Sequence, residues 1–146
     1  MPPAKSVAHR TSPTNIGLGL MATLGAHDFG YIDTADLVQR VDRTLATIEQ
    51  LQRHEGHLLN WYDTRTLQPL LPRYVSTVDS GNLAAALLVM AVGLRDHAPA
   101  LAARSTALFD AMNFRLLLDP QRLLFSIGYR LADADGPGRL DDSYYD

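Results

Sequence analysis

The sequence lacks cysteine altogether, which excludes disulfide frameworks, thiolate zinc sites and cysteine nucleophiles. It also lacks a basic excess, because 13 Lys and Arg residues stand against 16 Asp and Glu residues, for a formal net charge of −3. Electrostatic binding of nucleic acid is therefore excluded as a default function, since no surplus of cations exists to neutralise phosphates. No apolar run reaches the roughly 18 residues that cross a bilayer, and residues 1–10 lack the apolar core of a secretory signal.

What is present is the composition of a soluble globular domain. The 146 residues match the size of one domain, and 47% of them are hydrophobic while 20% are charged. Residues 1–10 are expected to form a disordered lead-in, and ordered structure is expected from residue 11 onward.

A strong helix start follows the lead-in. Ser12 or Thr11 provides the cap and Pro13 fits the first turn, so this helix is expected to run to about Ala26. Within it, residues 17–22 spell GxGxxA, the letters of the dinucleotide-binding fingerprint. That fingerprint needs a strand before its first glycine and a tight turn onto a helix start. Because these glycines lie inside the predicted helix, no nucleotide cofactor is expected, nor any other cofactor.

Three further helices are predicted. The second opens with acids at residues 33–36 and ends near Gly56, and its apolar stripe at spacings of three and four is amphipathic. A third begins at Ser80 and is apolar nearly all round, which is typical of a helix buried on several sides. The fourth spans residues 98–112. The chain is therefore predicted to be mainly α.

The C-terminal third changes character. Residues 116–118, a turn at 119–122 and the alternating Phe125, Ile127 and Tyr129 predict a small β-hairpin. Residues 133–138 read as a loop. Residues 141–144 resemble the first turn of another helix.

The histidines do not form a convincing metal site. His54 and His57 have a metal-like spacing, but they flank Gly56 at a predicted helix end, where one shared face is not assured. We expect them to be solvated or capping residues, and we expect no metal.

Residues 60–65 combine aromatic and polar side chains. Two adjacent aromatics, Trp61 and Tyr62, are followed by Asp63 and Arg65 and preceded by Asn60. Aromatic rings stack on sugar CH faces, and amide, carboxylate and guanidinium groups bind hydroxyls, so the cluster suits a carbohydrate subsite. The same residues also suit a buried tryptophan beside a structural Asp–Arg pair, and composition does not separate the two interpretations.

Two further polar clusters are candidates. Residues 76–82 crowd polar side chains at the start of the third helix, where Asp79 or Ser80 is expected as the cap. Residues 141–144 repeat this arrangement and bring two carboxylates, which glycoside hydrolysis requires as a pair. Adjacent aspartates are equally typical of a cap and a solvated neighbour.

Four segments resemble cyclic β-1,2-glucan synthases, specifically the start of their central glucoamylase-like domain. They are TSPTNIGL at 11–18, GHLLNWYDTRTLQPL at 56–70, PRYVSTVDSGNLA at 72–84 and LFSIGYRLADADGPGRLDDSYYD at 124–146. The segments occur in order and with sensible spacing. The resemblance implies that residues 11–146 form the N-terminal segment of an (α/α)6 toroid, about four of its roughly twelve helices.

The resemblance also implies a function. In the synthases this domain transglycosylates linear β-1,2-glucan into rings, and related domains of this fold hydrolyse β-1,2-glucan. Asp141 and Asp142 are the candidates for supporting acid–base chemistry. The remaining matching residues are expected at the sugar-binding rim, where they bind substrate: Asn60, Trp61, Tyr62, Asp63, Arg65, Asp79, Ser80, Asn82 and Tyr144.

The chain is several times shorter than the family domain, so it is expected to be a truncated piece that lacks the full catalytic apparatus. Its expected partners are a β-1,2-glucan oligosaccharide and either the remainder of the parent domain or a second copy. The alternative is a non-catalytic helical protein that self-associates through exposed apolar helix faces. A cytoplasmic location is expected, with the parent synthase at the bacterial inner membrane.

Overall fold

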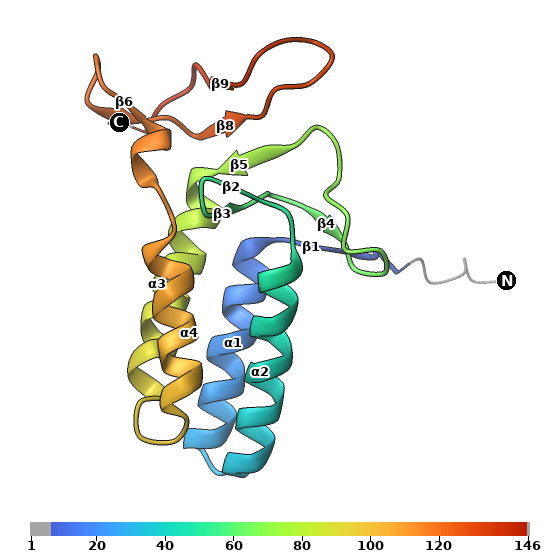
Figure 1. Ribbon diagram of the computed structural model, residues 1–146, viewed down its shortest axis with the longest axis vertical. Coiled ribbons are helices and arrows are strands. Elements are labelled where there is room, and N and C mark those ends of the chain that lie inside the picture. Colours follow the sequence, from blue (N-terminus) through green and yellow to red (C-terminus); the bar gives the residue numbers. More distant parts are fainter. Residues whose placement is uncertain (1–6, 146) are drawn as a thin grey trace, which may run out of the picture.

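Four helices form the body of the molecule, and short strands gather over one end of them (Figure 1). The structure is a computed structural model and describes residues 7–145. The helices are α1 (Pro13–Asp28), α2 (Thr34–Gln50), α3 (Thr77–Gly93) and α4 (Pro99–Asp110). Among the described residues, no helix is long and apolar enough to cross a bilayer.

All strand pairs are antiparallel and short. The largest sheet has three strands in the order β5–β8–β9, and Val75 of β5 lies opposite Tyr129 of β8. Three two-stranded pairs join β1 to β4, β2 to β3 and β6 to β7. The bounds are β1 (Arg10–Thr11), β2 (Arg53–His54), β3 (His57–Leu58), β4 (Tyr62–Asp63), β5 (Tyr74–Ser76), β6 (Leu118–Asp119), β7 (Leu124–Phe125), β8 (Gly128–Arg130) and β9 (Arg139–Leu140), with a 3-10 turn η1 (Phe114–Leu117) before β6.

Helices α1 and α3 form the centre of the bundle. Both run away from the strand layer, and they pack more extensively on each other than any other pair of elements (Figure 1). The contact is close because Gly17 faces Ala86, where an added Cβ would stand 3.0 Å from the alanine Cβ. Apart from Asp79, helix α3 carries no charged side chain. These two helices are therefore the inner pair.

Helices α2 and α4 cover the inner pair from outside. The apolar stripe of α2 is buried as its spacing predicted, and its charged face is solvated. Arg104 of α4 forms ion pairs with Asp42 and Glu49 of α2, so the two outer helices are also tied to each other. Inner apolar helices inside an outer amphipathic layer are the arrangement expected of an (α/α) toroid segment.

The prediction of a helix buried on several sides holds for most of α3. Leu83, Leu87 and Met90 are fully or almost fully enclosed. One side of the inner pair nevertheless stays open, and we term it the apolar face. Its residues are Leu18, Leu88, Val89 and Val92, which are 45–64% exposed.

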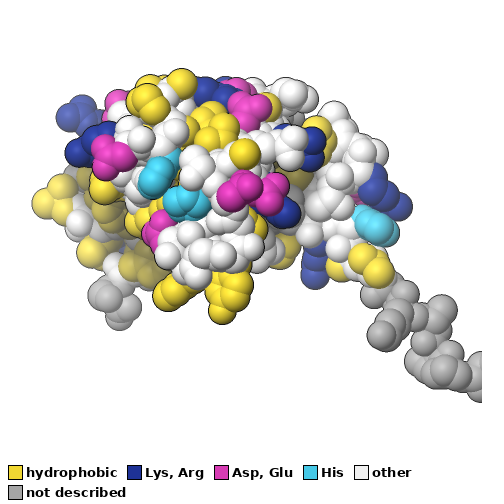
Figure 2. Space-filling model, turned by 90° about the horizontal axis from the view of Figure 1, so that it is seen from below, with side chains coloured by type: hydrophobic (Ala, Val, Ile, Leu, Met, Phe, Trp, Pro, Cys, Tyr) yellow, Lys and Arg dark blue, Asp and Glu magenta, His cyan; other side chains and the backbone are white. Residues whose placement is uncertain are grey.

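The end of the bundle away from the strand layer carries both positive and negative side chains, without a patch of one sign. Figure 2 shows Lys and Arg side chains interspersed with acids, histidines and apolar groups on that face. Phe29 and Tyr31, on the loop that joins α1 to α2, are 82% and 83% exposed.

Several predicted boundaries were wrong. Helix α2 ends at Gln50 instead of near Gly56, because Leu51 turns to extended backbone and still reaches the core. A tight turn between β2 and β3 follows, in which Glu55 and Gly56 both have positive φ. A side chain at Gly56 would collide with the carbonyl group of Ala111. The turn, and not a helix end, explains this glycine.

The third helix starts earlier than predicted. Its cap is Ser76, whose hydroxyl accepts from the Asp79 amide, so neither Asp79 nor Ser80 is the cap. The lead-in also ends early, since Arg10 already pairs with Asp63. The rest of that prediction falls partly on residues 1–6, which lie outside the described residues.

A C-terminal hairpin is present as the β6–β7 pair, but the prediction was wrong for Leu116 and Leu117, which belong to the 3-10 turn η1. Tyr129 does not belong to it, because β8 pairs with β5 in the three-stranded sheet. Residues 141–144 do not begin a helix. Tyr144 instead forms an antiparallel bridge with Ser126, which anchors this segment on the strand layer.

Candidate functional site

The starts of the two inner helices lie side by side beneath the strand layer. Ser12 caps α1 by accepting from the Asn15 amide at 3.3 Å, and Ser76 caps α3 in the same way. Two parallel helices that begin together bring two positive dipole ends to one place. Acceptor groups and negative charge are favoured there.

One carboxylate bridges these two starts. Asp79 Oδ1 accepts from the Thr14 hydroxyl at 2.6 Å and from the Thr14 amide at 3.3 Å. Asn82 Nδ2 donates to the same hydroxyl at 3.0 Å. We term Thr14, Asp79 and Asn82 the helix-start cluster. It includes two residues that the sequence analysis named and adds Thr14, which that analysis did not.

A groove runs beside the helix-start cluster along the inner pair. It has a volume of about 320 Å³ and is lined by Thr14, Leu18, Met21, Asn82 and Ala85. Three apolar residues form one part of its lining, and two members of the cluster form the other. A pyranose has the matching character, because its CH faces are apolar and its hydroxyls lie at the edge.

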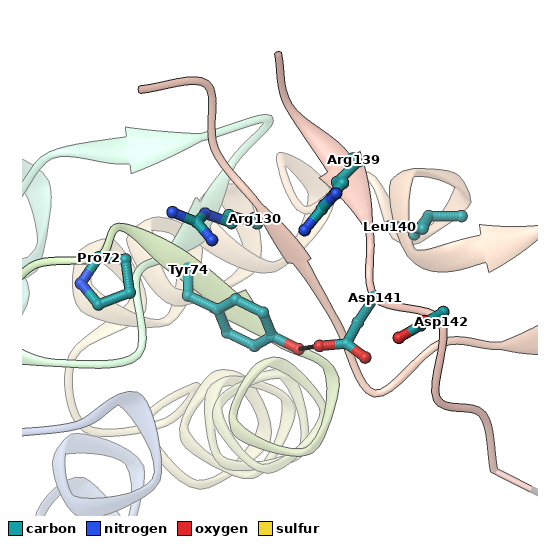
Figure 3. Close-up of a pocket in the computed structure, with 7 residues that line it drawn as sticks. All are labelled: Pro72, Tyr74, Arg130, Arg139, Leu140, Asp141 and Asp142. Atoms are coloured by element: carbon teal, nitrogen blue, oxygen red, sulfur yellow. Dashed lines mark hydrogen bonds between the residues drawn. The ribbon is translucent and has the colours of Figure 1, made fainter. Parts of the chain in front are cut away.

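A second cavity lies in the three-stranded sheet and has a volume of about 360 Å³ (Figure 3). We term it the strand pocket. The Tyr74 hydroxyl donates to Asp141 Oδ2 at 3.1 Å, and Asp142 follows directly. Burial, together with the neighbouring Asp141 carboxylate, raises the pKa of Tyr74, so its hydroxyl remains a donor. The lining residues are Pro72, Tyr74, Arg130, Arg139, Leu140, Asp141 and Asp142.

The sheet explains why these side chains meet. Arg130 and Arg139 are register partners on β8 and β9, so both guanidinium groups reach the same pocket. The Tyr74 ring crosses β8 at Gly128, where any side chain would collide with it. The pocket thus combines two cations, two carboxylates and a phenol, which can bind a polyhydroxylated ligand. The Arg130 guanidinium is already ion-paired with Asp133 at 2.9 Å and with Asp135 at 3.2 Å.

The cluster at residues 60–65 is divided by the structure. Tyr62 is fully buried. Its hydroxyl donates to the Gln52 carbonyl at 2.6 Å and accepts from the Leu59 amide at 2.7 Å, and burial raises its pKa to about 12. Tyr62 therefore offers no ring face for stacking, and this candidate sugar contact is corrected to a core residue.

Trp61 remains partly exposed, but one of its faces is occupied. The guanidinium carbon of Arg10 lies 4.8 Å from the ring centroid, a cation–π contact. The contact arises because β1 pairs with β4. A ligand that stacks on this face has to displace Arg10.

Asp63 and Arg65 satisfy each other. Asp63 accepts from the Arg65 guanidinium at 3.0 Å and from the backbone amides of Arg65 and Thr66. These hydrogen bonds hold the pKa of the Asp63 carboxyl well below its usual range. This geometry favours the structural interpretation of the Asp–Arg pair.

Ser80 is also corrected from a candidate sugar contact to a buried residue. It is 1% exposed and its hydroxyl lies 2.9 Å from His57 Nδ1. His57 is completely buried, so the expectation of a solvated or capping histidine was wrong for this residue. Its Nε2 has no hydrogen-bond partner among the described residues, and burial lowers its pKa. Among residues 7–145, no three His, Asp or Glu side chains are placed to hold a metal ion.

Tyr144 belongs to a separate group on the C-terminal hairpin. Its hydroxyl donates to Asp119 Oδ2 at 2.9 Å, and Arg122 lies 4.6 Å from its ring centroid. Asn60 is held by its backbone, which donates to the Tyr74 carbonyl at 2.8 Å. The predicted candidates thus fall into separate groups rather than one site.

The residues that sequence reasoning missed are Thr14, Tyr74, Arg130 and Arg139. Each of them lies in a segment that carries the family resemblance. The available signal was therefore membership of those segments. No local motif marks these residues, because their partners are distant in the sequence.

Two comparisons with known sequences bear on this fold. Residues 1–123 match the family model described as "Protein of unknown function (DUF3131)". The cyclic beta-(1,2)-glucan synthase NdvB of Rhizobium meliloti is 47% identical over 98 residues, which is 67% of this chain and 4% of that protein. The resemblance seen in the sequence is confirmed.

Solved structures support the fold class. An endo-beta-1,2-glucanase from Chitinophaga pinensis, in complex with sophorotriose and glucose, matches with a TM-score of 0.75 at 19% identity. The match covers 88% of this chain and 32% of that one. A putative glucoamylase from Bacteroides fragilis gives the same TM-score and identity over 87% and 32%. The prediction of a mainly α, partial toroid is confirmed, and the chain spans about a third of these two structures.

Proposed function

Because the chain belongs to the DUF3131 family, whose description assigns no activity, we propose a function from its site: it carries part of the sugar-binding rim of a β-1,2-glucan-processing domain. The observation that carries the proposal is the helix-start cluster beside an apolar groove. Similarity to a β-1,2-glucan synthase and to a glucanase that binds sophorotriose supports β-1,2-linked glucose as the ligand.

The roles divide between the two cavities. Asn82, which lines the helix groove, and Asp79, which is linked to it through Thr14, bind sugar hydroxyls. Trp61 offers a stacking face once Arg10 moves aside. Within the larger domain, Asp141 and Asp142 support acid–base chemistry at the strand pocket, with Tyr74 as a donor to the first of them. Asn60 and Tyr144 contact the ligand from the edges of this rim, while Asp63 and Arg65 hold the turn beside Trp61.

The proposal for this chain is binding without turnover. Hydrolysis needs two carboxylates on opposite sides of the glycosidic bond, about 5 Å apart for retention or about 6.5–9.5 Å apart for inversion. Asp141 and Asp142 are sequence neighbours on one edge of the strand pocket. The ring-forming or hydrolytic reaction is therefore a property that we propose for the larger domain.

Titration with β-1,2-linked gluco-oligosaccharides tests the proposal. The chain has a single tryptophan, so a fluorescence change reports on Trp61 alone, and amide chemical shifts report on the two cavities. We expect saturable shifts around Asp79 and Asp141, with weaker binding of β-1,3- and β-1,4-linked controls. The absence of any response at millimolar concentrations of the β-1,2-linked sugar would contradict the proposal.

A specific observation favours self-association as a second role. The apolar face exposes Leu18, Leu88, Val89 and Val92. The last three share one side of α3 by their spacing of three and four residues, and exposed apolar patches mark contact sites. Light scattering over a range of concentrations should show a dimer or larger species that Val92→Lys dissociates, while Gln39→Lys on the outer layer leaves it unchanged. A strictly monomeric wild type would rule out this role. The remainder of a larger domain is the other proposed partner for this face.

A further inference from the structure

We propose that Thr14 is the positioning residue of the helix groove: it clamps one oxygen of Asp79 and orients the amide of Asn82, so that both side chains are held ready to bind ligand hydroxyls. This inference rests on the proposed function and names the residue that orients the side chains of that site. Neither the family resemblance nor any local motif singled out Thr14 as a site residue.

Close packing of the inner helices makes the contact possible. Gly17 lies one turn beyond Thr14, and an added Cβ there would stand 3.0 Å from Ala86 and 3.5 Å from the Asn82 carbonyl oxygen. Without a side chain at this position, α1 approaches α3 closely enough for Thr14 to reach Asp79. The two residues are 65 positions apart in the sequence.

The hydroxyl of Thr14 does two tasks at once. It donates to Asp79 Oδ1 at 2.6 Å and accepts from Asn82 Nδ2 at 3.0 Å. A hydroxyl can donate and accept together, whereas a methyl group can do neither. The chain of hydrogen bonds runs from amide to hydroxyl to carboxylate and links the Asn82 and Asp79 side chains through Thr14.

The clamp determines what remains for a ligand. Asp79 Oδ1 already accepts two hydrogen bonds from Thr14, while Oδ2 accepts none from residues 7–145. Asn82 uses one of its two side-chain N–H groups for Thr14, which leaves the second N–H as a donor and the side-chain oxygen as an acceptor. The groove lining therefore carries the Asn82 amide, and Asp79 is joined to that lining through Thr14, so acceptors for sugar hydroxyls lie beside an apolar surface.

Two substitutions at Thr14 test the role. Thr14→Val keeps the shape and removes the hydroxyl, and Thr14→Ser keeps the hydroxyl. We expect Thr14→Val to weaken the binding of a β-1,2-linked gluco-oligosaccharide by about five- to tenfold, and Thr14→Ser to stay within about twofold of the wild type. Wild-type affinity in Thr14→Val would overturn the positioning role.

A double-mutant cycle separates positioning from direct contact with the sugar. If Thr14 acts through its two partners, Thr14→Val should change affinity less than twofold in a chain that already carries Asp79→Ala and Asn82→Ala. An equal loss in both backgrounds would mean that Thr14 touches the sugar itself, which overturns the proposal.

A readout without ligand distinguishes failure of this inference from failure of the proposed function. The side-chain amide signals of Asn82 in NMR spectra should shift in Thr14→Val and return in Thr14→Ser. These signals also show whether the Thr14→Val variant is folded. Unchanged Asn82 signals in a folded Thr14→Val would overturn the clamp. An intact clamp in a wild type that binds no sugar would instead refute the proposed function alone.

Discussion

The helix-start cluster and the turn at residues 60–66 contain similar polar side chains, yet they differ in how these are satisfied. In the turn, Asp63 accepts from Arg65 and Thr66, which are two and three residues away. In the helix-start cluster, Asp79 accepts from Thr14 across 65 positions, and its other oxygen accepts no hydrogen bond from the described residues. A carboxylate satisfied by its own turn builds structure, whereas one held by a distant element and left half-engaged is ready for a ligand.

The largest effect is expected from separating the inner helices. Gly17→Val forces the branched side chain against Ala86 and should lower the free energy of unfolding by about 2 kcal/mol, as overpacking does. It should also remove the Thr14–Asp79 contact while sparing the turn at 60–66. Gly19→Ala is the matched control, because nothing lies within 4 Å of its added Cβ and alanine favours the helix. Urea denaturation measures both, and equal stability of the two variants would contradict the packing argument.

The second largest effect is expected from the pH dependence of His57, which contacts Ser80, the residue that follows Asp79. Burial holds the pKa of His57 below its usual value of 6.5, so the unfolded chain takes up a proton at a higher pH than the folded chain does. Stability should therefore be complete above pH 6.5 and fall as the pH drops below it, by up to about 1.4 kcal/mol per pH unit. His57→Gln should flatten this dependence, and His97→Gln, at an exposed position, should retain it. A wild type whose urea midpoint is constant from pH 7 to pH 5 would show that His57 is not protonated on unfolding.

The comparison itself is tested by removing one carboxylate from each region. Asp79→Asn should weaken oligosaccharide binding by about tenfold, because a charged acceptor is lost. Asp63→Asn should leave the affinity within about twofold and lower the urea midpoint slightly, since a local turn loses its ion pair. Isothermal titration and urea denaturation on both variants give the answer. A reversed pattern would place the sugar at the turn.

The smallest effect is expected at Trp61. Arg10→Gln removes the cation from the ring and should increase quenching of Trp61 fluorescence by acrylamide, because one ring face becomes accessible. Oligosaccharide affinity should rise by less than about threefold if the sugar stacks on that face. Arg122→Gln, which uncovers Tyr144 in the same manner, is the control and should leave Trp61 quenching unchanged.

The helices were predictable because their signals are local. The stripe of α2 and the Ser–Pro start of α1 need only neighbouring residues to be recognised. Leu51 shows where this fails: it continues the apolar stripe but belongs to extended backbone, so the predicted helix was too long. Ser76 was missed as a cap because several polar residues follow it and all of them are good cap formers.

The site was predictable as a set of segments but not as a geometry. Tyr62 and Trp61 are adjacent, and a two-residue strand gives no alternation that would tell which ring faces the core. The Tyr74–Asp141 contact joins residues 67 positions apart, and sequence reasoning supplied neither that pairing nor the β5–β8 register that underlies it. The family resemblance predicted which segments contain the site residues. Which of these residues contact each other became clear only from the fold.

The strand layer has a consequence for the order of unfolding. Its strands are two or three residues long and join distant parts of the chain, such as residues 10 with 63 and 75 with 129. Each helix, by contrast, forms from neighbouring residues. Segments with few buried apolar contacts and short hydrogen-bonded ladders open first. Amide hydrogens of β5 and β8 should therefore exchange with solvent through partial opening, while those of α1 and α3 exchange only when the whole chain unfolds. A ligand bound at the rim would slow hydrogen exchange in the strands, which open most easily.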